Sequence, residues 1–185
     1  TQKAIAFTQG MQKYGVMANA KHFPGHGDTA SDSHHTLPIL NFDKARLDSI
    51  ELYPYRRVFD AGVGSVMTAH LNIPSLEPNT NLPTSLSKNV VTDLLQTELG
   101  FNGLIITDGL NMKGAANYST SAEVNLEALK AGNDLLLHQL CKIDIFEHPG
   151  QCKYWCERCQ SVTPSIFCRI RSLSCRWVCP RFITQ

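Results

Sequence analysis

Histidines and aspartates are concentrated in one short stretch, KHFPGHGDTASDSHHTLPIL, at residues 21–40. It holds four of the seven histidines of the chain. Asp32 and His34 are two residues apart, so the carboxylate can accept a hydrogen bond from the imidazole, which fixes the tautomer and stabilises the imidazolium. A histidine held in this way can donate a proton to a leaving group and later take one back from water. The spacing therefore fits a general acid and base, although two solvated loop residues would look the same.

A second candidate for chemistry is Asp108. It ends the apolar run LIIT and is followed by a glycine. A carboxylate that emerges from a buried strand into a concave site can be tuned by desolvation and by its neighbours. The alternative is an aspartate that only caps the next turn.

The histidine-rich stretch could instead hold a metal ion. His22 and His26 are four residues apart and could both bind zinc. Asp28 or His34 would supply the third ligand and leave one position open for water. Against this, the sequence has no HExxH helix, and all the ligands would come from one loop. His70, at the end of GSVMTAH, is either a further site residue or a satisfied core histidine.

Four short apolar runs predict strands, at residues 16–20, 64–71, 103–110 and 133–137. Segments with helical spacing lie between them, at residues 42–62, 87–100 and 120–130. Pro54 is expected in the first turn of a second helix within the first segment. Gly100 is expected to end the next helix, and Thr120 with Glu123 forms a possible capping box for the last one.

Strands that alternate with helices imply an α/β fold with a parallel sheet, either an open doubly wound sheet or a barrel. In both architectures the active site lies at the carboxyl ends of the strands. The polar residues follow this rule, since His22 and His26 follow the first predicted strand, His70 ends the second and Asp108 ends the third. We therefore expect a catalytic face at that end of the sheet.

Composition excludes some classes of protein. The formal net charge is +1, which gives no indication of a nucleic-acid partner. No apolar run is long enough for a membrane segment, and the first residues lack the pattern of a signal peptide. The chain begins at Thr1 within an apparent amphipathic helix, which suggests a fragment. Composition leaves the cellular compartment open.

The composition changes abruptly near Leu137, where we place a domain boundary between residues 1–137 and 138–185. All seven cysteines and both tryptophans lie after it, and alanine is absent there. A frameshifted or unstructured tail is the favoured interpretation. The alternatives are a disulfide cluster and a zinc site. The zinc site would use Cys156 and Cys159 with Cys175 and Cys179.

Four segments together resemble glycoside hydrolase family 3, in its bacterial β-N-acetylhexosaminidase branch: KHFPGHGDTASDSHHTLP, GVGSVMTAHLNIPSLEP, LPTSLSKNVVTDLLQTELGFNGLIITDGLNMKGA and ALKAGNDLLL. The resemblance covers residues 1–137 and its first motif is highly specific. It implies a TIM-type barrel of which this chain holds about the last four βα units.

The resemblance also implies roles for individual residues. Asp108 matches the catalytic nucleophile, and Asp32 and His34 match the dyad that serves as general acid and base. Lys21 and His22 match positions that hold sugar hydroxyls. The implied reaction is a retaining hydrolysis that releases terminal β-linked N-acetylglucosamine from cell-wall muropeptides or related oligosaccharides.

The implied enzyme needs no metal or organic cofactor, and its partner is a carbohydrate. Because the upstream units of the barrel would be missing, we expect the 185-residue chain alone to be inactive. A β-glucosidase of the same family is the nearest alternative. A non-catalytic remnant with a zinc-binding tail is the alternative from another class.

Overall fold

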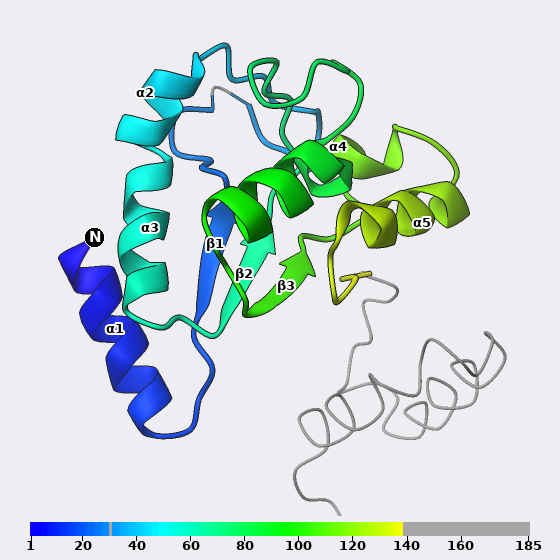
Figure 1. Cartoon of the computed structure of the whole chain (residues 1–185). Coiled ribbons are helices and arrows are strands. Elements are labelled where there is room, and N and C mark those ends of the chain that lie inside the picture. The colour runs from blue at the N-terminus through cyan, green and yellow to red at the C-terminus, as the bar shows by residue number, and fades with distance from the viewer. Residues whose placement is uncertain (30, 139–185) are drawn as a thin grey trace, which may run out of the picture. The chain divides into compact units, whose positions relative to one another are not determined.

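A computed structural model describes residues 1–29 and 31–138 of the chain (Figure 1). Its centre is a sheet of three parallel strands in the order β1-β2-β3: β1 (Asn19–Phe23), β2 (Ser65–Thr68) and β3 (Leu104–Thr107). The segment after α5 continues the sheet beyond β3 through a parallel bridge between Ile106 and Leu135. The Thr107 N–H donates to the Leu135 carbonyl at 2.9 Å. The predicted α/β fold with a parallel sheet is confirmed.

The first strand begins later than the sequence indicated. A strand was expected over residues 16–20, whereas β1 begins at Asn19 and continues to Phe23. Val16 and Met17 are apolar but exposed, and they belong to the connection that follows Gly15, whose φ is +77°. The apolar residues of this segment thus belong to a connection, and the strand itself is polar enough to resemble a loop in sequence.

Within residues 1–29 and 31–138, five α-helices precede or follow the strands: α1 (Gln2–Lys13), α2 (Lys44–Ser49), α3 (Leu52–Asp60), α4 (Lys113–Ala116) and α5 (Ser121–Ala131). A short 3-10 helix, η1 (Thr84–Leu86), and a π-helix, η2 (Asn89–Glu98), lie between β2 and β3. Helices α1 and α3 lie side by side near β1 (Figure 1).

The predicted signals for helix ends match the structure. Pro54 lies in the first turn of α3, where its missing N–H costs no intrahelical bond. Thr120 and Glu123 form the predicted capping box of α5. Gly100, with φ at +67°, follows η2. These signals depend on residues within one or two turns of the helix end, which is why they could be read from the sequence.

Two hydrophobic clusters fix the strands and the segments that follow them. The larger one joins side chains of all three strands to α3 and η2, with the ring of Phe23 edge-on to Tyr55 at 5.1 Å between centroids. The smaller one contains Leu86, Leu110, Ala115, Val124 and Ala128. It anchors the chain segment after β3, including α4, against η1 and α5. The residues next to Asp108 are therefore held by apolar packing.

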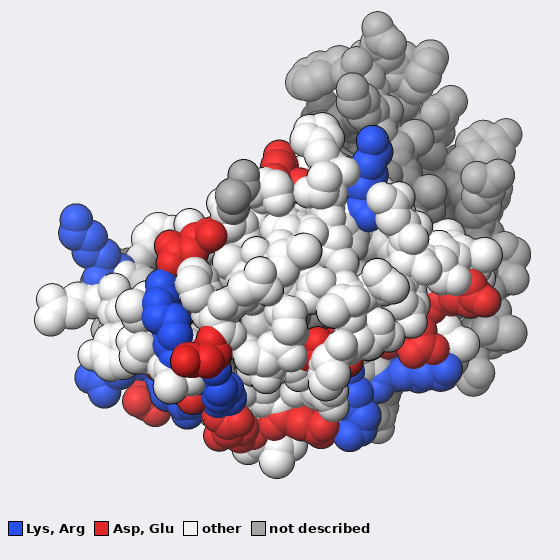
Figure 2. Space-filling model, turned by 90° about the horizontal axis from the view of Figure 1, so that it is seen from above, with Lys and Arg blue, Asp and Glu red and all other residues white. Residues whose placement is uncertain are grey.

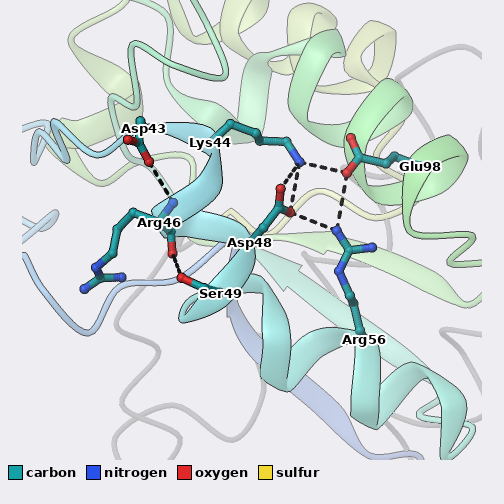
Figure 3. Close-up of polar contacts among 7 residues, drawn as sticks. All are labelled: Asp43, Lys44, Arg46, Asp48, Ser49, Arg56 and Glu98. Atoms are coloured by element: carbon teal, nitrogen blue, oxygen red, sulfur yellow. Dashed lines mark hydrogen bonds and ion pairs between the residues drawn. The ribbon is translucent and has the colours of Figure 1, made fainter.

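Charged side chains link α2, α3 and η2 on the surface (Figure 3). Asp48 accepts from the Lys44 ammonium at 2.9 Å and from the Arg56 guanidinium at 2.8 Å. Both cations also contact Glu98, at 2.8 and 3.4 Å. Burial raises the pKa of Asp48, but the two cations outweigh it, so the pKa lies below its usual value. This network ties together the helices that carry the larger core.

Within residues 1–29 and 31–138, no helix is long and apolar enough to cross a membrane. The predictions for the tail, including the zinc site at Cys156, Cys159, Cys175 and Cys179, fall outside the described residues. The predicted domain boundary at Leu137 stays a prediction.

Candidate active site

Asp108 follows β3 directly, at the carboxyl end of the sheet. Its backbone N–H donates to the Thr68 carbonyl at 2.9 Å, which continues the pairing with β2. One carboxylate oxygen, Oδ1, accepts from the Gly109 N–H at 2.8 Å. The side chain is 20% exposed, so the other oxygen can reach a ligand. The backbone of two strands therefore fixes this carboxylate at the site edge.

His22 lies next to this carboxylate, with 3.7 Å between its Nε2 and Oδ2 of Asp108. The register between β1 and β2 shifts at His22, because Lys21 pairs with Met67 and Phe23 pairs with Thr68. Burial lowers the pKa of His22, and the charge of Asp108 opposes this without cancelling it. Near pH 7 the ring is therefore mainly neutral and can both donate and accept hydrogen bonds.

Lys21 precedes His22 and its side chain is exposed. Its charge reaches the His22 ring, since it contributes to lowering the pKa of that histidine. Of the two residues indicated for sugar binding, His22 therefore lies beside Asp108, and Lys21 is its neighbour in β1.

The loop after β1 carries Asp32 and His34, and both are exposed. The Asp32 carboxylate accepts from the backbone N–H of His34 at 2.9 Å, whereas the sequence suggested a bond from the imidazole. This backbone bond is the main reason that the pKa of Asp32 is lowered. Its carboxylate thus shapes the turn and leaves the His34 ring free to face solvent or a ligand.

His34 is close enough to the other candidates for its charge to reach them. A positive charge on His34 lowers the pKa of both His22 and His70. The loop is also bonded to the segment that follows Asp108, because the Gly114 N–H donates to the Ser33 carbonyl at 3.1 Å. The structure thus brings the loops after β1, β2 and β3 to the same end of the sheet.

His70 is fully buried, as the more conservative interpretation of the sequence expected. Its Nε2 lies 3.0 Å from the Gly109 carbonyl, so this nitrogen carries the proton and donates. Its Nδ1 then accepts from the Ser85 hydroxyl at 2.6 Å. Burial lowers the pKa of His70, which keeps the ring neutral. His70 therefore supports the turn next to Asp108 and does not contact a ligand.

Arg46 holds the first half of the loop, which the sequence did not indicate. Its guanidinium contacts Glu51 and Asp28, with 2.6 Å to a carboxylate oxygen of each. The nearby Gly25 has φ at +146°, and a Cβ there would lie 2.7 Å from the Glu51 side chain. Nothing in the local sequence pairs Arg46 with a loop residue 18 positions earlier.

The metal alternative finds no support in the part of the chain that the structure describes. No group of three histidine, cysteine or acidic side chains gathers closely enough there to hold an ion. His26, one of its proposed ligands, is instead bonded within the loop, to Thr29 at 2.7 Å and to Ser33 at 3.3 Å.

Figure 2 views the molecule from the carboxyl ends of the strands. Basic side chains (lysine and arginine) and acidic side chains both lie mainly around the margin of this view. The visible surface offers no extended patch of one charge. Such a surface suits an uncharged ligand better than a polyanion.

Comparison with known families decides the class of this site. The profile described as "Glycosyl hydrolase family 3 N terminal domain" matches residues 1–148. The chain belongs to glycoside hydrolase family 3. The family predicted from the sequence motifs is thereby confirmed.

Members of family 3 with known names and structures agree. The chain is 40% identical over 134 residues to the "Beta-hexosaminidase" of Chromobacterium violaceum, a match that covers 72% of this chain and 37% of the relative. The structure of a family 3 β-N-acetylglucosaminidase from Paenibacillus sp. str. FPU-7 superposes with a TM-score of 0.70 at 45% identity, over 72% of this chain and 25% of that one. A "Beta-glucoside phosphorylase BglX" gives a TM-score of 0.69 at 28% identity, over 74% and 26%. The chain thus spans less than half the length of these relatives.

Proposed function

We propose that this chain carries the catalytic residues of a retaining glycosidase that releases terminal β-linked N-acetylglucosamine from cell-wall muropeptides or related oligosaccharides. The observation that carries the proposal is the carboxylate of Asp108 beside the neutral ring of His22, with the Asp32–His34 loop over the same end of the sheet. The names of the family 3 relatives support the sugar.

In the first step, the Asp108 carboxylate attacks the anomeric carbon and forms a glycosyl ester. The bond to the leaving oxygen breaks as the His34 imidazolium gives that oxygen its proton. In the second step, the now neutral His34 takes a proton from water, and the hydroxide displaces Asp108. Asp32 holds the turn that carries His34 through its bond from the His34 N–H.

Lys21 and His22 are proposed to hold the sugar. Ring hydroxyls need donors and acceptors together, which the neutral His22 offers, and the Lys21 ammonium adds a charged donor. The close approach of His22 to Asp108 places a bound hydroxyl next to the reacting carbon. These residues perform the proposed chemistry without a cofactor.

We further propose that the sheet belongs to a TIM-type barrel. The three parallel strands, with the bridge at Leu135, correspond to about the last four βα units. The proposal includes residues 1–137 as part of the catalytic domain and residues 138–185 as a separate tail, which we interpret as frameshifted or unstructured in preference to a zinc module.

Two other reactions use the same first step. A β-glucosidase would differ only in lacking room for the acetamide. Phosphorolysis is a second candidate, because one family 3 relative is named a β-glucoside phosphorylase. A histidine as the proton shuttle would not repel a phosphate acceptor as a second carboxylate would.

The test uses a chimera in which residues 1–137 replace the region of the Chromobacterium violaceum β-hexosaminidase that they match. We expect it to hydrolyse aryl N-acetyl-β-glucosaminides, with faster turnover than of aryl β-glucosides. A 5-fluoro glycosyl fluoride of N-acetylglucosamine should leave a sugar adduct on the peptide that contains Asp108. Addition of phosphate distinguishes hydrolysis from phosphorolysis through the product formed.

Asp108→Asn should abolish turnover in this chimera because the ester can no longer form. The matched control is Asp93→Asn, which removes an exposed carboxylate paired with Lys88. A folded chimera without activity, or an adduct on another carboxylate, would contradict the proposed function.

A further inference from the structure

Gly114 lies at the point where the loop with Asp32 and His34 meets the segment that follows Asp108. It is buried in α4, and its N–H donates to the Ser33 carbonyl at 3.1 Å. Ser33 stands between the two residues of the proposed acid–base pair, and it is only 5% exposed. The loop therefore touches the rest of the site through the backbone of Gly114.

No other residue type fits at this position without movement of the loop. A Cβ on Gly114 would lie 3.0 Å from the Ser33 carbonyl oxygen, 3.1 Å from the Thr36 carbonyl oxygen and 3.0 Å from the Cβ of His70. The two carbonyl oxygens belong to the backbone, and the Cβ is the first atom of the fully buried His70 side chain. None is the flexible end of a side chain, so a methyl group would displace the loop.

The opposite side of the contact is rigid. His70, against which Gly114 packs, donates to the Gly109 carbonyl and accepts from Ser85, so both ring nitrogens are bonded. Ala115, the next residue in α4, is fully buried in the smaller hydrophobic cluster. Under steric pressure at Gly114 the exposed loop therefore moves before the buried side does.

We propose that Gly114 is a positioning residue that sets the distance between the acid–base loop and the nucleophile. This inference rests on the proposed function. Asp108 is fixed by β2 and β3, whereas His34 is fixed through Ser33 and Gly114. The absence of a side chain at Gly114 lets the loop dock closely enough for His34 to reach the leaving oxygen.

Displacement of the loop should slow some substrates more than others. A displaced loop weakens proton transfer by His34 but leaves Asp108 and His22 in place. Substrates with poor leaving groups need the proton in the first step, whereas dinitrophenyl leaving groups do not. A misplacement of about 1 Å can cost about a hundredfold in rate. The contacts at Gly114 require its neighbours to move by a few tenths of an ångström, so a smaller loss follows.

The kinetic test compares Gly114→Ala with Gly10→Ala in the chimera defined above. Gly10 lies in α1, and no atom lies within 4 Å of the position that a Cβ would take there, so alanine fits without contact. We expect Gly114→Ala to lower kcat/KM about tenfold for a phenyl N-acetyl-β-glucosaminide. The loss should be no more than about threefold for the dinitrophenyl glycoside, and Gly10→Ala should lose neither.

A second kinetic measurement separates positioning from general damage. With the dinitrophenyl substrate the second step needs a base, and azide, an anion that attacks without losing a proton, bypasses it. Azide should therefore restore turnover of Gly114→Ala and give a glycosyl azide. Equal losses on both substrates without azide rescue would overturn the inference, whereas an inactive unsubstituted chimera would overturn the proposed function instead.

Amide hydrogen exchange tests the contact even if Gly114→Ala does not fold. In the unsubstituted 185-residue chain, the Gly114 N–H should be protected by its bond to Ser33. Asp32→Ala should speed its exchange by loosening the turn, while the Ala116 N–H, bonded to Met112 within the same segment, should change little. Exchange of the Gly114 N–H at the rate of a free amide, or no response to Asp32→Ala, would contradict the inference.

Discussion

The proposed site divides its tasks between residues fixed by the sheet and residues fixed by a loop. Asp108 directly follows β3 and its N–H bonds to Thr68 of β2. His22 belongs to β1, and the residues on either side of it pair with β2. Asp32 and His34 belong to a loop whose shape depends on the bond from the His34 N–H to the Asp32 carboxylate. The sheet therefore positions the nucleophile, and the loop positions the proposed proton donor.

His34→Ala in the chimera should impair hydrolysis of poor leaving groups far more than that of dinitrophenyl glycosides, because only the former need protonation. The expected loss on a phenyl glycoside is about 10²- to 10⁴-fold. Steady-state kinetics over a series of aryl leaving groups measures this.

Asp32→Ala should show the same selectivity more weakly, since it removes the carboxylate and keeps the imidazole. If His34→Ala slows all leaving groups equally, His34 is not the acid.

The buried histidine predicts a pH effect on stability. Burial lowers the pKa of His70 below the ordinary value of 6.5, so the unfolded chain binds more protons between the two values. Stability should therefore fall as the pH drops from about 6.5 towards the folded pKa, and it should be level above 6.5. His22, whose pKa is also lowered, adds to the slope in the same window.

His70→Gln removes one of these titrations, because its amide can still donate to the Gly109 carbonyl but does not ionise. The decrease in Tm between pH 7.5 and 5.5 should be smaller in this variant than in the unsubstituted chain. His35→Gln, an exposed change in the loop, serves as the control and should leave the decrease unchanged. An unaltered slope in His70→Gln would show that His70 does not bind fewer protons when folded.

Among individual residues, the sequence predicted those whose position follows from a strand end. Asp108 and His22 meet as expected, because parallel strands bring their carboxyl ends to one edge. Arg46 and Gly114 were not predicted. Their contacts, with Asp28 and with Ser33, join segments far apart in the chain, and no local pattern encodes such a pair.

At the scale of elements, apolar packing and ion pairs contribute differently to stability. The helices α3 and η2 are held to the sheet mainly by buried side chains of the larger core. The network of Lys44, Asp48, Arg56 and Glu98 lies at the edge of this packing (Figure 3) and is partly exposed. Its contribution should therefore be small and sensitive to salt.

Asp48→Asn should lower the free energy of unfolding by about 1 kcal/mol at low ionic strength, since two cations lose a partner. The difference should shrink in about 1 M salt, where the screening length is short. Urea titrations at both salt concentrations measure it.

Asp93→Asn breaks a single exposed pair with Lys88 and should change stability by less than about 0.5 kcal/mol. A large, salt-independent loss in Asp48→Asn would mean that the network is a buried structural unit and not a surface one.

Element types were more predictable than their bounds. The capping box at Thr120 and the end of η2 at Gly100 were predicted correctly because caps are local. β1 was misplaced because it is an edge strand with polar residues on one face. Its burial depends on neighbours from distant parts of the chain, which periodicity cannot show.

At the scale of the whole molecule, the described part of the sheet ends at β1, whose outer edge is unpaired there. β1 pairs only with β2 among the described residues, and Asn19 and Lys21 are exposed along it. Unpaired strand edges are open to pairing with another chain. In the proposed barrel, this edge would pair with a strand that precedes the matched region in the family 3 relatives.

The proposed barrel predicts that the 185-residue chain gains stability and activity from the missing units. Mixing it with the part of the Chromobacterium violaceum β-hexosaminidase that precedes the matched region should raise its Tm in a concentration-dependent way, because the partner binds only the folded state. The chain alone should be inactive, since a site at the end of a barrel needs loops from strands all around it. The mixture should hydrolyse the N-acetyl-β-glucosaminide.

Two proline variants test whether the partner pairs with the edge of β1. Lys21→Pro removes the N–H of a β1 residue and should block the gain in Tm if pairing uses this edge. Lys113→Pro lies away from this edge, in the segment after β3, and tests general damage. A chain that is fully active alone, or a Tm that ignores the added partner, would rule out completion of the barrel through β1.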